Sequence, residues 1–330
     1  MDPRNTRDKG RWARHLTRAA TLAAAALFAS HAFAQAYPNR AIKIMVPFST
    51  GSATDTTARV LADRLAPRLG VPVIVDNKPG ASGTIGSTAV ARSAPDGYTL
   101  ILTSSSTHSA TPALFAKLAF DPTEDFIHIA RVATIPMMLV VRGDAPAKTI
   151  PEMRAAARNK PLSFAYGSAT SQIAGATFSA VAGVPSEGIP YKSQPPAVTD
   201  LLGGHVDYLF ADLSVVTSFM QSGRLAGVAL SAPRRSKEFP SVPTLGELGY
   251  KDFDLVVWVG LAAPKGTPAN VVDRLSREVQ AVLAEPATVA KLSQFGMDVA
   301  VNSPAEHRAF ALSQRDIWTS RAKAAGIQPE

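Results

Sequence analysis

The stretch "AIKIMVPFSTGSATDTTARVLADRLAPRLG" at residues 41–70 decides the fold class, because its character changes twice along its length. "AIKIMVPF" is short and apolar, as in a buried strand, and "TDTTARVLADRLAPRLG" has the amphipathic spacing of a helix that ends at Gly70. Between them lies a loop of hydroxyl residues and one glycine. A phosphate cradle, the turn of a nucleophile and a carboxylate-binding loop all take this form. The rest of the chain must decide among them.

Strand-like and helix-like segments keep alternating after this stretch. This order predicts βαβ units and an α/β fold with a mostly parallel sheet. The apolar segments "FIHIARVAT" and "MMLVVRG" follow one another without a long helix, so we expect the chain to cross there into a second domain. "FDLVVWVGLAAP" is the expected return. The predicted lobe one comprises residues 35–138 and 258–330, and lobe two comprises residues 139–257.

The N-terminus has the form of a secretory signal peptide. Residues 2–18 hold six basic side chains, the apolar run "AATLAAAALFA" follows, and Ala32 and Ala34 are small residues at the −3 and −1 positions. A span of the bilayer needs about 20 apolar residues, which disfavours the alternative of an anchor helix. We predict a signal peptide over residues 1–34, cleaved after Ala34 with Ala36 as the second choice, and an exported mature protein.

Composition excludes several classes of protein. The net charge is +8 for the whole chain and near +4 without the leader, with no Lys/Arg run, so nucleic acid is not an expected partner. The chain has no cysteine, which excludes a disulfide framework. About 296 mature residues are enough for two domains with cores of their own.

Loops at the carboxyl ends of the predicted strands are rich in serine and threonine. In open α/β sheets ligands lie at these ends, where the N-termini of helices present free N–H groups. Hydroxyl neighbours and helix N-termini together make an anion site without arginine. We therefore expect a cleft for a small anion, lined by loops at residues 49–55, 104–109, 167–172, 192–196 and 212–214.

The sequence gives little support for a catalytic site or a metal site. The chain lacks the G-x-S-x-G elbow of serine hydrolases and the G-x-x-x-x-G-K-[ST] loop that binds nucleotides. His108, beside a run of serines, is a candidate base for a hydrolase, and the alternative is a residue that caps a helix or faces solvent. The other mature histidines lie far apart in sequence without ligand-like spacing, so neither a metal nor another cofactor is expected.

Two carboxylates follow strands at the predicted cleft, and each has two interpretations. Asp55 either contacts a ligand donor or occupies the first turn of a helix, where the dipole favours it. Asp212 either contacts the ligand at its strand end or caps the following helix through the backbone.

Four stretches of the chain resemble one family. They are "YPNRAIKIMVPFSTGSATDTTARVLADRL", "VIVDNKPGASGTIGSTAVARSAPDGYTLIL", "IPYKSQPPAVTDLLGGHVDYLFAD" and "GRLAGVALSAPRRSKEFPSVPTLGELGY". They resemble the Bug-type receptors, which are the periplasmic substrate-binding proteins of the tripartite tricarboxylate transporter family. The resemblance covers residues 37–328. It implies a type II periplasmic-binding-protein fold, two lobes that close on a ligand, and no enzyme activity.

The resemblance also implies how a ligand is held. In the family, backbone amides, hydroxyls and ordered water hold the carboxylates. Matched residue by residue, the implied ligand-binding residues are Ser49, Thr50, Gly51, Ser52, Asp55, Ser105, Ser106, Ser168, Ala169, Thr170, Ser171 and Asp212.

Two loops depart from the family pattern. The first loop, usually P-P-G-G-x-x-D, is S-T-G-S-A-T-D here, and the second loop is shorter, with Gln172 where histidine is frequent. These changes bear on the identity of the ligand. We expect a monomeric receptor that delivers a small mono- or dicarboxylate to transporter subunits in the membrane, the alternative being a sensor that contacts a membrane signalling protein.

Overall fold

Three parallel strands form the first part of the sheet. The computed structural model describes residues 37–250, 253 and 255–329, so the predicted signal peptide lies outside the described residues. Strand β1 (Ile42–Val46) lies between β2 (Val73–Asn77) and β3 (Thr99–Ser104) and is parallel to both. The predicted strand over residues 41–48 is therefore real and sits between two parallel neighbours.

Strand β4 (Phe126–Arg142) is shared between two groups of strands. Its first part, from Phe126 to Pro136, pairs antiparallel with β9 (Val256–Pro264), which also pairs with β3. Its last part, from Met137 to Val141, pairs antiparallel with β7 (Tyr208–Asp212). The two apolar segments expected in this region thus form one long strand, and the sheet runs without a break through β4.

The second group of strands repeats the parallel plan. Strand β5 (Leu162–Tyr166) lies between β6 (Ser186–Pro190) and β7 and is parallel to both. Two further strands pair with β4, namely β8 (Leu225–Leu230) and β10 (Asp298–Val299). The strand order is β2-β1-β3-β9-β4-β7-β5-β6. We call the group around β1 the first lobe and the group around β5 the second lobe.

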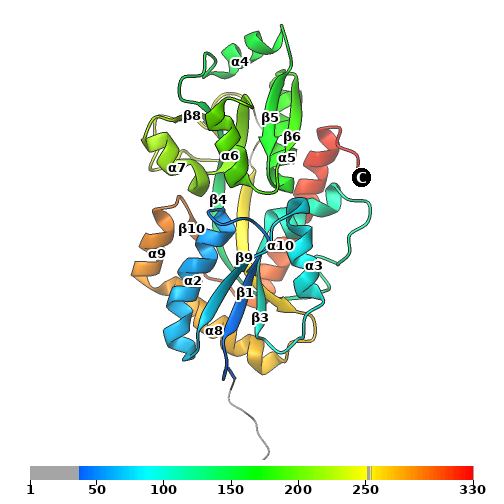
Figure 1. Cartoon of the computed structure of the whole chain (residues 1–330), viewed down its shortest axis with the longest axis vertical. Helices are drawn as coiled ribbons and strands as arrows, with labels where there is room; N and C mark the ends of the chain where they lie inside the picture. The colour runs from blue at the N-terminus through cyan, green and yellow to red at the C-terminus, as the bar shows by residue number, and fades with distance from the viewer. Residues whose placement is uncertain (1–36, 251–252, 254, 330) are drawn as a thin grey trace, which may run out of the picture. The chain divides into compact units, whose positions relative to one another are not determined.

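Helices follow the parallel strands in both lobes. In Figure 1, helices α2, α5 and α6 begin at the level where the two lobes meet. Since helix N-termini carry partial positive charge and free N–H groups, this arrangement collects anion-binding groups between the lobes. The bounds of the helices are α2 Ala53–Leu69, α3 Thr84–Ala91, α4 Ile150–Ala157, α5 Ala169–Val181, α6 Gln194–Gly203, α7 Leu213–Gln221, α8 Ala269–Ala284, α9 Pro286–Ser293 and α10 Pro304–Ala324.

The hydrophobic core continues across the junction of the lobes. Trp318 of α10 is fully buried in the same cluster as Phe178 of α5 and Phe210 of β7. The predicted boundaries assign α10 to lobe one, yet this side chain packs with the core of the second lobe. Residues 40–330 accordingly form one compact unit.

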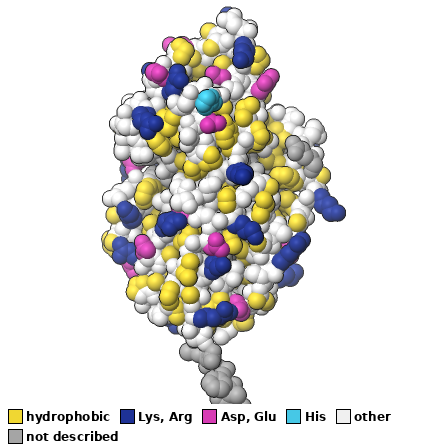
Figure 2. All heavy atoms as spheres, viewed as in Figure 1, with side chains coloured by type: hydrophobic (Ala, Val, Ile, Leu, Met, Phe, Trp, Pro, Cys, Tyr) yellow, Lys and Arg dark blue, Asp and Glu magenta, His cyan; other side chains and the backbone are white. Residues whose placement is uncertain are grey.

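The face of the molecule shown in Figure 2 has no large patch of charges of one sign. Lysine and arginine side chains are spread over that face among acidic and hydrophobic ones. Within the part of the chain that the structure describes, no helix combines the length and the apolar character needed to cross a membrane.

Candidate functional site

The tetrapeptide Gly-Ser-Ala-Thr occurs twice, at residues 51–54 and 167–170, and both copies start a helix. The first copy connects β1 to α2 in the first lobe, and the second connects β5 to α5 in the second lobe. In each copy the serine is the N-cap residue and the threonine lies in the first turn. The two lobes therefore present matching helix N-termini.

Each capping serine organises its helix start in the same way. The Ser52 hydroxyl accepts a hydrogen bond from Asp55 N at 3.2 Å and lies 3.0 Å from the Thr54 hydroxyl. The Ser168 hydroxyl accepts one from Ser171 N at 3.2 Å and lies 3.0 Å from the Thr170 hydroxyl. Such caps satisfy one amide of the first turn and leave others free.

The two helix starts line one buried cavity between the lobes. It has about 320 Å³ of space free of protein atoms, part of it open to solvent. The part of it that the centre of a water-sized sphere can enter is about 20 Å³, roughly the room of one water molecule, so a larger ligand requires the two lobes to move apart. Every lining side chain is buried. The lining residues are Phe48, Ser52, Ala53, Thr54, Ser104, Ser106, Ser168, Thr170, Ser193, Gln194, Asp212, Val257 and Val259.

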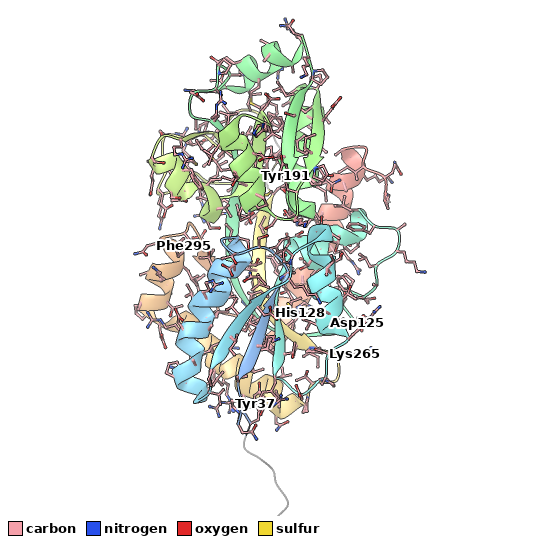
Figure 3. All side chains as sticks on the ribbon, in the orientation of Figure 1. Tyr37, Asp125, His128, Tyr191, Lys265 and Phe295 are labelled. Carbon is pink, nitrogen blue, oxygen red and sulfur yellow. The ribbon has the colours of Figure 1, made fainter. Side chains whose placement is uncertain are left out.

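A third wall comes from the loop between β6 and α6. Tyr191, labelled in Figure 3, donates a hydrogen bond of 2.7 Å to Asp200 of α6 and so ties the strand end to the helix. Ser193 and Gln194 follow directly and line the cavity. The sequence indicated this loop but not these two side chains. Their signal was the same as for the other loops, namely polar residues between a strand and a helix.

Two hydrogen bonds connect the lobes at the cavity. Ala169 N of the second lobe donates to the Ser106 hydroxyl of the first lobe at 3.0 Å, and Ser49 N donates to the Ser193 hydroxyl at 3.3 Å. Both use a backbone amide from one lobe and a serine from the other. The lobes therefore meet through groups that can also bond to an anion.

Asp55 organises the first loop from inside. Its carboxylate accepts hydrogen bonds from Gly51 N (2.9 Å), from the Asn77 amide (2.9 Å) and from Arg59, whose two nitrogens each lie 3.0 Å away. Burial by itself would raise the pKa of Asp55, but these hydrogen bonds outweigh it and hold the pKa below its usual value. The carboxylate thus supports the turn, and its predicted contact with a ligand stays a prediction.

Several other predicted residues lie beside the cavity rather than in its lining. Ser49, Thr50 and Gly51 precede the lining residues of the first loop, and the Gly51 amide is bonded to Asp55. Ser105 accepts a hydrogen bond of 2.7 Å from Trp258 N and fixes β9. Ser171 donates its hydroxyl to Ser168 O at 3.0 Å within the cap.

Asp212, at the end of β7, is among the residues that line the cavity. It is the N-cap residue of α7 and its side chain makes no capping hydrogen bond, as the alternative of capping through the backbone requires. Its backbone amide donates to Gln194 Oε1 at 2.9 Å. Burial raises the pKa of Asp212 to about 6, and the Gln194 side chain offsets part of that effect.

The histidines differ from the sequence-based expectation. His108 neither caps a helix nor faces solvent, since it is 2% exposed and its Nδ1 lies 2.8 Å from the Thr107 hydroxyl. His128, labelled in Figure 3, packs between His108 and His307 with ring centroids 6.1 and 4.7 Å away. Residues distant in sequence thus form a buried cluster in the first lobe. His108 is outside the cavity lining, and the described residues hold no arrangement of three or more His, Asp or Glu side chains fit for a metal ion.

Comparison with known proteins defines the class. Residues 57–326 match the model of the tripartite tricarboxylate transporter family receptor. The chain is 35% identical over 300 residues to Protein BugT of Bordetella pertussis, covering 89% of this chain and 92% of that protein. The structure of the periplasmic binding protein BugD superposes with a TM-score of 0.85 at 36% identity, covering 89% of this chain and 100% of that one.

A further structure shows a relative with its ligand. MatC from Rhodopseudomonas palustris, solved with bound malate, superposes with a TM-score of 0.83 at 30% identity, covering 86% of this chain and 99% of that one. The fold and the matches define a solute receptor of the periplasmic-binding-protein type. The chain belongs to the tripartite tricarboxylate transporter family receptors, which confirms the family and the fold class expected from the sequence.

Proposed function

We propose that this receptor binds a small organic carboxylate between its lobes, with carboxylate oxygens on the two Gly-Ser-Ala-Thr helix starts. The single observation that carries the proposal is the pairing of these identical N-termini across one buried cavity. The amides of Ala53, Thr54 and Thr170 have no acceptor among the described residues, and amides at a helix N-terminus bind anions. Two such sites favour a dicarboxylate.

Neutral donors are sufficient for useful affinity. A hydrogen bond to a charged oxygen contributes about 1.5–3 kcal/mol, so several of them reach the roughly −8 kcal/mol of micromolar binding. The proposed contacts are Ser52, Ala53, Thr54, Ser106, Ser168, Ala169 and Thr170. The residues that hold the loops in place or act through ordered water are then Ser49, Thr50, Gly51, Asp55, Ser105 and Ser171. Binding of malate by MatC supports this class of ligand.

The proposed action is capture and delivery without chemical conversion. The cavity lining consists of hydroxyl, amide, aliphatic and aromatic groups with one carboxyl group, and His108 lies outside it. Family membership supports delivery to membrane subunits of a tripartite tricarboxylate-type transporter. We propose a monomer located in the periplasm, with the leader cleaved after Ala34. N-terminal sequencing of the protein from a periplasmic fraction tests the cleavage.

A thermal-shift screen of the mature protein against a panel of carboxylates tests the proposal. A ligand at 100 times its Kd adds about 2.7 kcal/mol of stability, which is a readily measured shift in Tm. Dicarboxylates should stabilise the protein, and sugars and inorganic cations should not. Stabilisation by sugars or cations alone would show that the cavity serves another class of ligand.

Threonine-to-valine variants locate the site. Thr54→Val and Thr170→Val each remove one lining hydroxyl and should weaken binding by about tenfold. Thr177→Val is the matched control, because Thr177 is a buried residue of the same helix α5 whose hydroxyl has no hydrogen-bond partner among the described residues. Equal affinities of all three variants would place the ligand elsewhere.

A further inference from the structure

The loop between β2 and α3 has an unusual backbone. Four consecutive residues have positive φ, namely Gly80 (132°), Ala81 (46°), Ser82 (51°) and Gly83 (89°). Glycine adopts such angles freely, but an L residue in the left-handed region is strained. Ala81 and Ser82 are the only residues other than glycine with positive φ among those that the structure describes. The loop therefore stores strain at two successive positions.

This loop packs against the wall of the cavity. An added Cβ at Gly83 would lie 2.5 Å from Thr107 Cγ2 and 3.1 Å from the ring of Phe48, and Phe48 lines the cavity. Thr107 belongs to a π-helical turn, Ser106–Ala110. Such turns are rare and often lie at functional sites. Two uncommon backbone features thus meet beside the proposed site.

One hydroxyl group joins the strained loop to the second lobe. Ser106 Oγ donates a hydrogen bond of 3.4 Å to Ser82 O and accepts one of 3.0 Å from Ala169 N of the second lobe. A serine hydroxyl can donate and accept at the same time, and Ser106 is 2% exposed, so the connection is shielded from solvent. When the lobes separate, Ser106 loses the Ala169 donor and is free to turn away from Ser82.

Strained backbone persists only where neighbouring contacts hold it, and one of these contacts exists only while the lobes are together. We propose that the loop at residues 80–83 positions Ser106 for the bond that joins the lobes, and that the strain of this loop is released when the lobes open. Ala81 and Ser82 are thus positioning residues that set how tightly the lobes close. This inference rests on the proposed function, because a ligand in the cavity must hold the lobes together against this strain.

Calorimetric titration of glycine variants tests the inference. Ser82→Gly and Ala81→Gly each remove strain, and Ser82→Gly keeps the backbone oxygen that accepts from Ser106. Succinate, malate and adipate are the probes, since related receptors were solved with malate and with adipate. Each variant should bind the acids that bind the wild-type protein about fivefold to tenfold more tightly. Ser82→Ala is the matched control, because it keeps the strained conformation and should bind as the wild-type protein does.

A double-mutant cycle assigns the effect to Ser106. Ser106→Ala removes the hydroxyl that links the loop to the second lobe, so Ser82→Gly should no longer raise the affinity in that background. An equal gain in affinity with and without the Ser106 hydroxyl would overturn the positioning role.

The Tm of the ligand-free protein shows whether the strain depends on the position of the lobes. If the loop is released when the lobes open, Ser82→Gly should raise the affinity and change this Tm little. If the loop is strained in both positions, Ser82→Gly should raise this Tm and leave the affinity unchanged. That result, or weaker binding by Ser82→Gly, would overturn the inference and leave carboxylate binding intact. If none of the three acids binds the wild-type protein, the inference and the proposed function both fail.

Discussion

Asp55 shows how a buried charge shapes a binding loop without touching the cavity. Its carboxylate is tied to Gly51 and Asn77 and forms an ion pair with Arg59. The result is a loop of fixed geometry that leads into the helix start at Ser52. In a loop without the two prolines usual in the family, these bonds supply the rigidity.

Asp55→Asn should lower the free energy of unfolding by about 1.5–3 kcal/mol at pH 7. The folded protein holds the pKa of Asp55 below its unfolded value, so the carboxylate stabilises the fold above about pH 4 and this contribution disappears as the pH falls through the folded pKa. Urea unfolding of the wild-type protein and of Asp55→Asn at pH 7 and pH 3 measures this difference in the free energy of unfolding. A difference between them that does not shrink at pH 3 would contradict the assignment.

Gly51→Ala should cost about 1 kcal/mol of stability, because Gly51 has φ of +82° and an L side chain is strained there. The nearest atom to an added Cβ is Pro195 Cγ at 3.9 Å, so strain and not collision causes the loss. Gly246→Ala is the control, since Gly246 is exposed and lacks a positive φ. Thermal unfolding compares the two, and an equal loss in both would refute the explanation.

The loop between β6 and α6 depends on close backbone packing at the end of β5. A Cβ at Gly167 would lie 2.1 Å from the carbonyl carbon of Ser193. Only glycine lets the two loops approach so closely, and this approach brings Ser193 and Gln194 to the cavity.

Gly167→Ala should therefore displace the β6–α6 loop and reduce ligand affinity by tenfold or more, in addition to lowering Tm. Gly175→Ala is a matched control within the same lobe, because its Cβ would meet the Phe164 ring at 2.4 Å, in the core. It should lower stability by about 1–3 kcal/mol with affinity retained. Titration calorimetry on both variants decides, and equal affinities would show that Gly167 does not position the site.

The sequence predicted the secondary-structure elements of the first lobe well, because each has a clear apolar period and a loop rich in hydroxyls. It predicted the region of the cavity for the same reason. It did not predict which side chains face inward. Ser193 and Gln194 were missed, because side-chain direction at a strand end depends on strand register and on contacts between the lobes.

The sequence also did not predict contacts between residues that are distant along the chain. His108, His128 and His307 form one cluster although up to roughly two hundred residues separate them along the chain. The repeat of Gly-Ser-Ala-Thr is visible in the sequence, but only the structure shows that both copies line one cavity. A search for short repeats at strand ends would have found it.

Ligand binding should protect both lobes at once. Because the two helix starts face one cavity, hydrogen exchange at residues 52–54 and 168–170 should slow together when a dicarboxylate binds. Exchange in α4, which lies outside the cavity, is the internal control. Protection of one helix start alone would indicate a ligand held by a single lobe.

The crystal structure of the receptor with the tightest-binding carboxylate tests the proposed binding mode most directly. We predict carboxylate oxygens about 3 Å from the amides of Thr54 and Thr170, with the lobes closed over the ligand. A ligand held instead by lysine or arginine side chains, or one lying outside the cavity between the lobes, would contradict it.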